Sequence, residues 1–234
     1  MNEMKTKFRD RIEKTIGKTA FILTVILLGL LLSVFAGQSG MLLFYIVVLI
    51  TLWARKWDWR YFGITKPVWP RTIIKAFLFS ILLFILMDVL VQPLLELFFR
   101  PVDLSAFSAI EGNLFNYLLY IILGWVMGGF CEEIIYRGYV VKRLAIIFGD
   151  TNKTWLLSAI MAAIAFGFAH TYQGPSGIIS TAVIGLAFGL IFTYNRNNLL
   201  LLILLHGIYN MIAITLIYLG KPRIITEWVL EFFN

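Results

Sequence analysis

Long apolar runs, separated by short polar connections, make up most of this sequence. Several runs approach the roughly 20 residues with which a helix crosses the hydrocarbon core of a bilayer. An open sheet cannot cross, because lipid offers no partners for its unpaired backbone groups. The pattern therefore predicts an all-α, polytopic transmembrane helix bundle with about seven spans, within a range of six to eight. The predicted spans cover residues 19–36, 41–54, 73–95, 115–135, 155–170, 178–194 and 199–219, of which the second is short for a full crossing.

Composition agrees with a membrane protein. Sixty per cent of the residues are hydrophobic, 14% are charged and the mean hydropathy is +0.87, far from the balance of a soluble domain. No internal repeat or long flexible linker interrupts the pattern. We therefore expect a basic cytoplasmic N-terminal tail over residues 1–18 and a single membrane-embedded, protease-like domain over residues 19–234. The single cysteine, Cys131, excludes an internal disulfide and a cysteine-built zinc cage.

The net charge of +7 is distributed unevenly along the chain. If the N-terminus is cytoplasmic, 17 of the 20 Lys and Arg residues fall on the cytoplasmic side, and only Arg100, Lys221 and Arg223 fall outside. The positive-inside rule expects this split, so the charge indicates topology and contact with membrane lipid. We predict an integral protein of a bacterial cell membrane with a cytoplasmic N-terminus and no nucleic-acid partner. The sequence leaves the oligomeric state open.

Ionisable residues inside the apolar segments indicate where the chemistry lies. Such side chains are costly at membrane depth and are kept mainly where they face a polar interior. Both histidines of the chain and an adjacent pair of glutamates occur in such segments, each within a spacing that places residues on one helical face. We expect three helices to share one pocket. The three stretches are Glu132-Glu133-x-x-x-Arg137, Phe166-x-x-x-His170 and His206-x-x-x-Asn210.

The two glutamates have different expected roles. Glu133 precedes Arg137 by four residues, in the orientation that favours an intrahelical ion pair. Glu132 then remains less directly paired, above Gly128 and Gly129, where a glycine-lined notch has room for water or a substrate backbone. These features indicate that Glu132 is a general base.

The remaining polar residues complete a hydrolytic mechanism. His170 closes a helix before the break at residues 172–177, where it can meet water. His206 and Asn210 face the same way and can donate hydrogen bonds to the oxyanion of a tetrahedral intermediate. The hypothesis is that Glu132, assisted by His170, takes a proton from a water molecule that attacks a peptide carbonyl. Phe166 is expected to shape the pocket by packing.

The motifs EEIIYRG, FGFAH and NRNNLLLLILLHGIYN, in this order, resemble the signature blocks of the CAAX protease and bacteriocin-processing family, also called the CPBP or Abi family. The resemblance covers roughly residues 124–215. It implies a helical intramembrane endopeptidase like the type II CAAX prenyl protease, with Glu132 as the catalytic glutamate and Glu133 and Arg137 as its first-motif partners. It also implies that His170, His206 and Asn210 are the remaining polar site residues. Eukaryotic members remove a tripeptide from prenylated proteins, and many bacterial members are linked to peptide maturation, bacteriocin self-immunity or signalling.

Zinc is the main alternative for the same site, with Glu132, His170 and His206 as ligands. We expect no metal or other cofactor, because the chain has no His-Glu-x-x-His motif and a glutamate with a histidine can activate water unaided. Cys131 is expected to be a small buried residue and not a nucleophile. Asp88 is expected to be an interhelical partner or to lie near the outer aqueous end.

Three functions are compatible with these residues. The leading prediction is an intramembrane endopeptidase that cleaves a membrane-associated or lipidated peptide or protein near the cytoplasmic half of the membrane. The alternatives are a non-catalytic bacteriocin-immunity or regulatory protein that binds a peptide or partner in the same cavity, and a small transporter with a Glu/His proton relay. One difficulty concerns depth: with straight helices His170 lies about 10 Å from the level of Glu132 and His206 at ~1.5 Å rise per residue.

Overall fold

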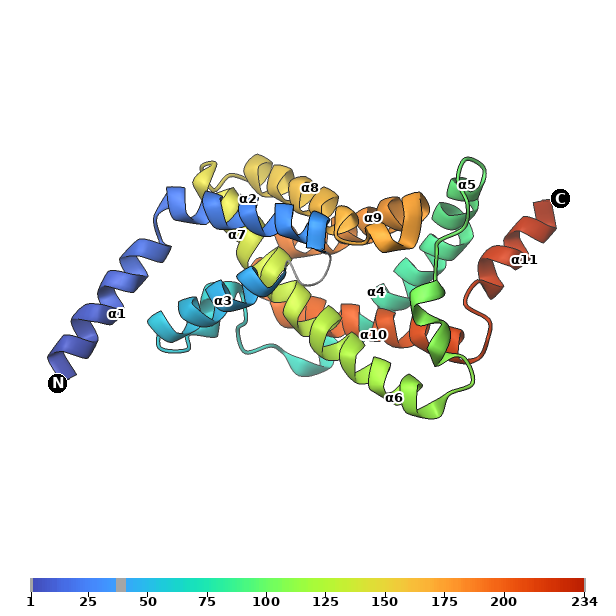
Figure 1. The fold of residues 1–234 in the computed structure, drawn as a ribbon, viewed down its shortest axis with the longest axis horizontal. Coiled ribbons are helices and arrows are strands. Elements are labelled where there is room, and N and C mark those ends of the chain that lie inside the picture. The colour runs from blue at the N-terminus through green and yellow to red at the C-terminus, as the bar shows by residue number, and fades with distance from the viewer. Residues whose placement is uncertain (1, 37–40, 234) are drawn as a thin grey trace.

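The computed structural model describes residues 2–36 and 41–233, and this part of the chain is helical without any strand (Figure 1). A single antiparallel bridge joins Ile64 to Asn198. The fold class predicted from the apolar pattern is confirmed. The α-helices are α1 (Asn2–Ile16), α2 (Thr19–Ala36), α3 (Leu42–Ala54), α4 (Trp69–Leu86), α5 (Gln92–Glu96), α6 (Leu114–Leu123), α7 (Lys142–Ile147), α8 (Asn152–Phe168), α9 (Gly174–Tyr194), α10 (Leu199–Tyr218) and α11 (Ile224–Phe233).

Within the described residues, four helical segments are long and apolar enough to cross a membrane: Trp69–Glu96, Leu114–Ile147, Thr171–Tyr194 and Leu199–Tyr218. A fifth counts only if the pair Lys7–Ile16 and Thr19–Phe35, bent by 64°, forms one span. Helices α3 and α8 are apolar but have only 13 and 17 residues. The predicted count of about seven is therefore not confirmed. All seven predicted segments are apolar, but only some form helices long enough to span a membrane alone.

The segment from Leu114 to Ile147 is one long helix that carries the acidic motif. It begins as α6, continues through two π-helical stretches, η5 (Gly124–Glu132) and η6 (Ile134–Val141), and ends as α7. The span predicted to stop at residue 135 therefore continues, because no proline or positive-φ glycine ends it before Gly149. π-Helical turns are rare and occur frequently at functional sites.

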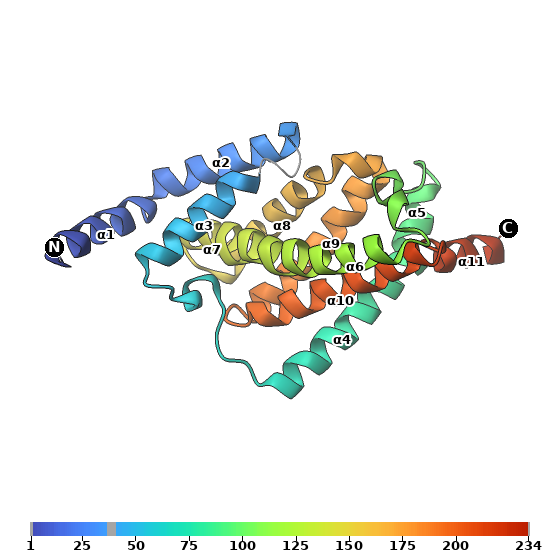
Figure 2. The same ribbon diagram turned by 60° about the horizontal axis from the view of Figure 1, so that its bottom comes forward.

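Different loops hold the helices together at each end of the bundle (Figures 1 and 2). At one end, the connection after α3 meets the start of α10 through the Ile64–Asn198 bridge. It meets the start of α7 through the Lys142 ammonium, which donates to the carbonyl oxygen of Tyr61 at 2.7 Å. At the other end, the Asp103 amide donates to the carbonyl of Gln173 at 3.0 Å. We call these the basic end and the far end, since the far end carries only Arg100, Lys221 and Arg223.

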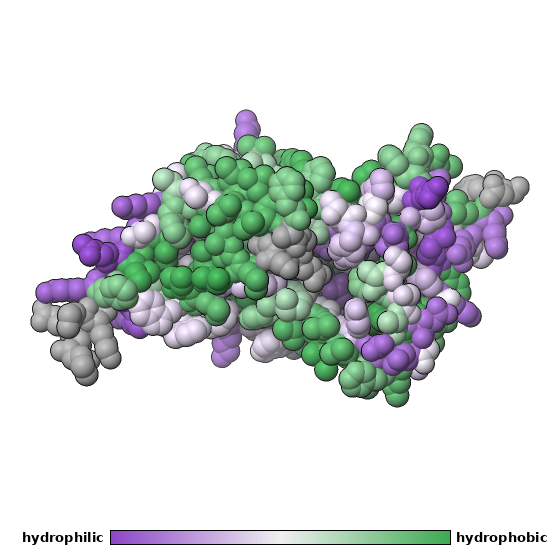
Figure 3. Space-filling view, viewed as in Figure 1, coloured by the Kyte–Doolittle hydropathy of each residue, from purple (hydrophilic) through white to green (hydrophobic). Residues whose placement is uncertain are grey.

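Apolar side chains cover much of the outside of the bundle between its two ends (Figure 3). Leu27, Phe77 and Ile122 are each more than half exposed. A monomeric soluble protein rarely presents such a continuous apolar surface, whereas lipid tails solvate it without cost. The surface therefore agrees with an integral membrane protein.

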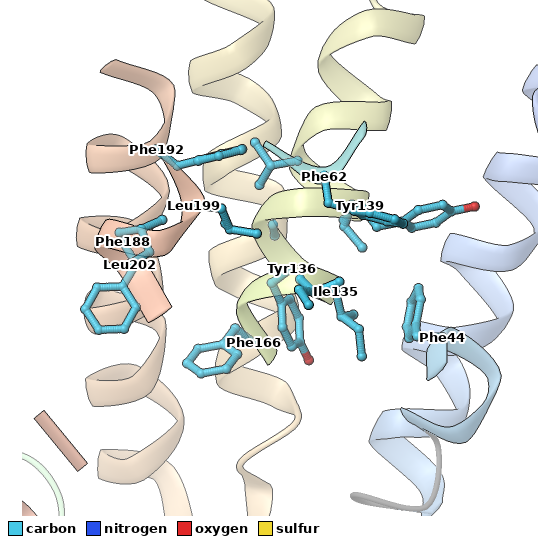
Figure 4. Packing of buried hydrophobic residues seen from close by; sticks show 14 of the residues in the cluster. Phe44, Phe62, Ile135, Tyr136, Tyr139, Phe166, Phe188, Phe192, Leu199 and Leu202 are labelled. Atoms are coloured by element: carbon cyan, nitrogen blue, oxygen red, sulfur yellow. The ribbon is translucent and has the colours of Figure 1, made fainter. Parts of the chain in front are cut away.

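The buried core lies around η6 and faces the basic end (Figure 4). Aromatic residues dominate it: the rings of Tyr136 and Phe166 meet edge to face with centroids 4.9 Å apart. The fully buried members include Phe44, Phe62, Tyr136, Tyr139, Phe188, Phe192, Leu199 and Leu202. This packing positions the acidic motif against α9 and α10.

Candidate active site

A cavity of about 740 Å³ lies inside the bundle, between η5, the end of α8, α9 and α10. The structure brings five of the seven sequence-predicted site residues to its wall, and the other two lie directly behind it. The wall residues are Glu132, Phe166, His170, His206 and Asn210. The three motifs therefore share one pocket.

Glu133 and Arg137 form a buried ion pair that holds His206. Glu133 Oε1 accepts hydrogen bonds from Arg137 Nη1 and from His206 Nδ1, both at 2.8 Å. Arg137 Nη2 donates to the carbonyl oxygen of Gly185 on α9, also at 2.8 Å. Glu133 and Arg137 are 0% and 1% exposed, so both charges depend on these contacts. The spacing predicted the ion pair, and the structure adds that the same carboxylate fixes the imidazole ring.

Glu132 points into the cavity beside His206. Its side chain is 19% exposed, and its Oε2 lies 3.9 Å from His206 Nε2. This separation is too long for a direct hydrogen bond, so both atoms can bind a shared third group such as a water molecule. Two adjacent glutamates approach one imidazole here because the π-helical turns separate neighbouring side chains less widely than an α-helix does.

His170 reaches the same cavity from the turn after α8. Its Nδ1 lies 2.8 Å from the carbonyl oxygen of Phe166 and must donate to it, since a carbonyl only accepts. In the neutral ring Nε2 then carries a lone pair. The Phe166 ring packs on His170, with centroids 4.7 Å apart, and also faces His206 at 6.3 Å. The depth mismatch expected for straight helices is therefore absent: α8 ends at Phe168, and η7 (Thr171–Gln173) closes the wall.

The glycine notch next to Glu132 is shared between the cavity and α10: Gly128 lines the cavity, and α10 packs against the same glycine. A Cβ on Gly128 would collide with Asn210 Nδ2 and lie 3.4 Å from His206 Nε2. Asn210 Nδ2 donates to the carbonyl of Gly124 at 3.1 Å. The glycines therefore serve two purposes, since they leave room at the cavity wall and let two helices pack closely. One N–H of the Asn210 carboxamide remains for another acceptor.

Substituting Gly128 by Ala should displace α10 and with it both polar side chains. We expect a loss of about 1–3 kcal/mol in unfolding free energy, typical of overpacking, together with a large loss of activity. Thermal unfolding of the purified protein in detergent measures the first effect. The matched variant Gly128→Ala with Asn210→Ala removes the amide that clashes, so it should recover stability without recovering activity. Equal stability of Gly128→Ala and the parent chain would contradict this packing.

Sequence reasoning missed several residues that complete the site. Phe188 packs against His206, with ring centroids 5.1 Å apart, and lies 5.2 Å from the Arg137 guanidinium carbon. Ser180 and Tyr172 line the cavity. The spacing Gly185-x-x-x-Gly189 was the available sign that α9 packs closely against α8 beside the site, because a Cβ on either glycine would contact α8.

The two residues expected to be structural differ in their surroundings. Cys131 is a half-buried free thiol next to Glu132. Asp88, in the π-helical turn η3 (Met87–Val91), is buried and lines the cavity. Its Oδ2 has no hydrogen-bond partner among the described residues, whereas its backbone carbonyl accepts from Thr226 of α11 at 3.1 Å. Asp88 Oδ2 is therefore an unsatisfied acceptor in the cavity wall, and the carboxylate interacts electrostatically with Arg223, which precedes α11.

The alternative zinc set was tested against this geometry. Within residues 2–36 and 41–233, no three His, Cys, Asp or Glu side chains are grouped so that they could hold a metal ion. His206 Nδ1 bonds to Glu133 and His170 Nδ1 to a backbone carbonyl, so a metal ion could meet these rings only through Nε2. The grouping of the side chains, and not these hydrogen bonds, is what does not fit a three-ligand zinc site.

Comparison with known proteins agrees with the motif resemblance. Residues 113–212 match the family model of type II CAAX prenyl endopeptidase Rce1-like proteins, which confirms the resemblance over this stretch. An uncharacterized protein from Mycoplasma capricolum subsp. capricolum (strain California kid) is 37% identical over 101 residues. The match covers 43% of this chain, but only 28% of the length of that relative. No solved structure matches the chain.

Proposed function

We propose that this chain, whose residues 113–212 match the type II CAAX prenyl endopeptidase family, is an intramembrane endopeptidase. It hydrolyses a peptide bond of a membrane-associated or lipidated substrate with water activated by Glu132 and His170. The observation that carries the proposal is the convergence of Glu132, His170 and His206, from three separate elements, on one cavity. An arrangement of this kind is expected of acid–base hydrolysis and is costly for a purely structural membrane core.

The charge balance of the site supports a division of roles. Glu132 and Glu133 as carboxylates, with Arg137 and a protonated His206, sum to zero, which a buried site favours. A protonated His206 donates Nδ1–H to Glu133 and directs Nε2–H toward the cavity. That N–H and the second N–H of Asn210 then serve as donors for the developing oxyanion.

The proposed reaction needs no covalent enzyme intermediate. Glu132 removes one proton from water, while His170 Nε2 accepts the hydrogen bond of the second O–H and orients the molecule. The oxygen attacks the carbonyl carbon, and the oxyanion is held by His206 and Asn210. Collapse of the intermediate breaks the C–N bond, and Glu132 returns its proton to the leaving amine, which balances the hydrolysis.

Comparative peptidomics tests the activity and identifies the substrate in one experiment. Membrane and secreted peptides are compared between cells that carry the natural chain and cells that carry Glu132→Ala at equal expression. At least one pair of new termini should depend on Glu132. Identical peptide profiles would instead favour a non-catalytic immunity or regulatory protein that binds its partner in the cavity.

Activity should not depend on metal. Because the carboxylate and imidazole groups can carry the proton transfers themselves, prolonged dialysis against EDTA should leave turnover unchanged. Elemental analysis of the purified protein should find well below one zinc per chain. Stoichiometric zinc whose removal abolishes turnover and whose return restores it would overturn the metal-free mechanism.

A further inference from the structure

The cavity that holds Glu132 is bounded by loops of the far end and, along α6 and η5, by the exposed side chains of Leu123 and Met127. Its outer wall is built at the far end by the connection between α5 and α6, by η7 and by the segment before α11. From the connection come Val102, Leu104, Ala106 and Phe107; Tyr172 and Gln173 come from η7; and Pro222 and Arg223 precede α11. Ala106 and Tyr172 are exposed, so the wall reaches the molecular surface there.

No part of the described cavity wall comes from the basic end. None of the lining residues belongs to residues 55–72, 137–155 or 192–200. The route in that direction is filled by the core around η6, where Phe62, Tyr139 and Leu199 are at most 1% exposed (Figure 4). The Glu133–Arg137 pair lies at the boundary between this core and the cavity. A peptide could not reach Glu132 from the basic end without unpacking that core.

The charges of the two ends indicate their sides of the membrane. Arg55, Lys66, Lys142, Lys153 and Arg196 lie in the loops or helix ends of the basic end, in addition to the basic residues of α1. The far end carries three basic residues, and one of them, Arg223, is already paired with Glu96 at 2.6 Å. By the positive-inside rule the basic end is cytoplasmic.

We infer that the cavity is entered from the extracytoplasmic side and that its substrate is a peptide segment presented at that face of the membrane. The cytoplasmic side, near which the sequence predicted cleavage, is closed by the core around η6. Two buried oxygens in the cavity, Asp88 Oδ2 and Ser180 Oγ, have no hydrogen-bond partner among the described residues. Either side chain can bind an N–H group of an extended peptide, or the ammonium of its lysine side chain, by turning its unpaired oxygen toward the cavity.

The substrate class rests on the proposed protease function, whereas the side of access does not. A labelling experiment separates the two, because it requires no turnover and works equally in Glu132→Gln. Three single cysteines are introduced into the Cys131→Ser chain: Ser180→Cys in the cavity, Lys66→Cys at the basic end and Lys221→Cys at the far end. Intact cells and inside-out vesicles are then treated with a small, membrane-impermeant methanethiosulfonate.

We expect Lys221→Cys and Ser180→Cys to react in intact cells, and Lys66→Cys to react only in inside-out vesicles. Ser158→Cys is the matched control, since Ser158 is as buried as Ser180 but does not line the cavity, and it should react in neither preparation. Labelling of Ser180→Cys only in vesicles, or in neither preparation, would overturn the inference. So would labelling of Lys66→Cys in intact cells. If labelling is as expected but peptidomics finds no cleavage, the access side stands and the protease function fails.

Discussion

Replacing Glu132 by Gln should lower peptide turnover by about 10²–10⁴-fold, the usual contribution of a general base. Gln keeps the shape of the side chain and can still accept a hydrogen bond, but it cannot take a proton from water. The rate is measured on purified protein in liposomes, with the peptide identified by peptidomics. Glu132 makes no direct hydrogen bond to His206, whose Nε2 lies 3.9 Å from its Oε2, so losing the weak charge interaction across this distance should lower the thermal unfolding midpoint only slightly.

The matched control is Glu231→Gln, which removes an exposed carboxylate of α11 and should leave the rate unchanged. A Glu132→Gln protein that turns over at the parent rate would exclude Glu132 as the base. A Glu132→Gln protein that has lost both activity and folding would not meet the prediction either, because the contacts of Glu132 assign it no structural role.

Substituting Arg137 by Met should destabilise the protein by about 3–5 kcal/mol, the range for breaking a buried pair by removing one partner. The Glu133 carboxylate would stay buried with His206 as its one remaining hydrogen-bond donor. The Gly185 carbonyl on α9 would also lose its donor. Denaturant or thermal unfolding in detergent measures the loss, which should be accompanied by loss of activity.

The double variant Arg137→Met with Glu133→Leu distinguishes the cost of an unpaired buried charge from the cost of lost packing. It leaves no buried charge behind, so it should be clearly more stable than Arg137→Met alone, although His206 would lose its anchor and activity should stay low. An Arg137→Met protein within about 1 kcal/mol of the parent chain, the typical effect of an exposed pair, would show that the pair is not buried as described.

Residue spacing predicted those parts of the site that lie on one helix. Glu133 and Arg137 are four residues apart, and helical geometry places residues at this spacing on the same face, whatever surrounds the helix. The same holds for His206 and Asn210, which both face Gly128. The all-helical class followed equally directly from the apolar runs, because lipid permits few other structures.

Contacts between helices could not be predicted in this way. Spacing shows which residues share a face of a helix, but not which helix packs against that face. Neither the hydrogen bond from Arg137 to the Gly185 carbonyl nor the packing of Phe188 on His206 was therefore expected. The π-helical turns that bring Glu132 toward His206 have no signature in the apolar pattern. Gly128 was interpreted as room for water or substrate, and spacing could not show that α10 also packs against it. The side from which the cavity opens depends on the loops of both ends and emerges only in three dimensions.

The central claim is that side chains from three separate elements meet at one cavity, and pairwise cross-linking tests it most directly. In a Cys131→Ser chain, Glu132→Cys is combined with His206→Cys, with His170→Cys or with Lys153→Cys, and each pair is treated with a short bifunctional methanethiosulfonate. The account predicts intramolecular cross-links for the first two pairs and none for the third, whose added cysteine is exposed and outside the cavity. Reagent that reacts with each thiol but links neither His206→Cys nor His170→Cys to Glu132→Cys would contradict it.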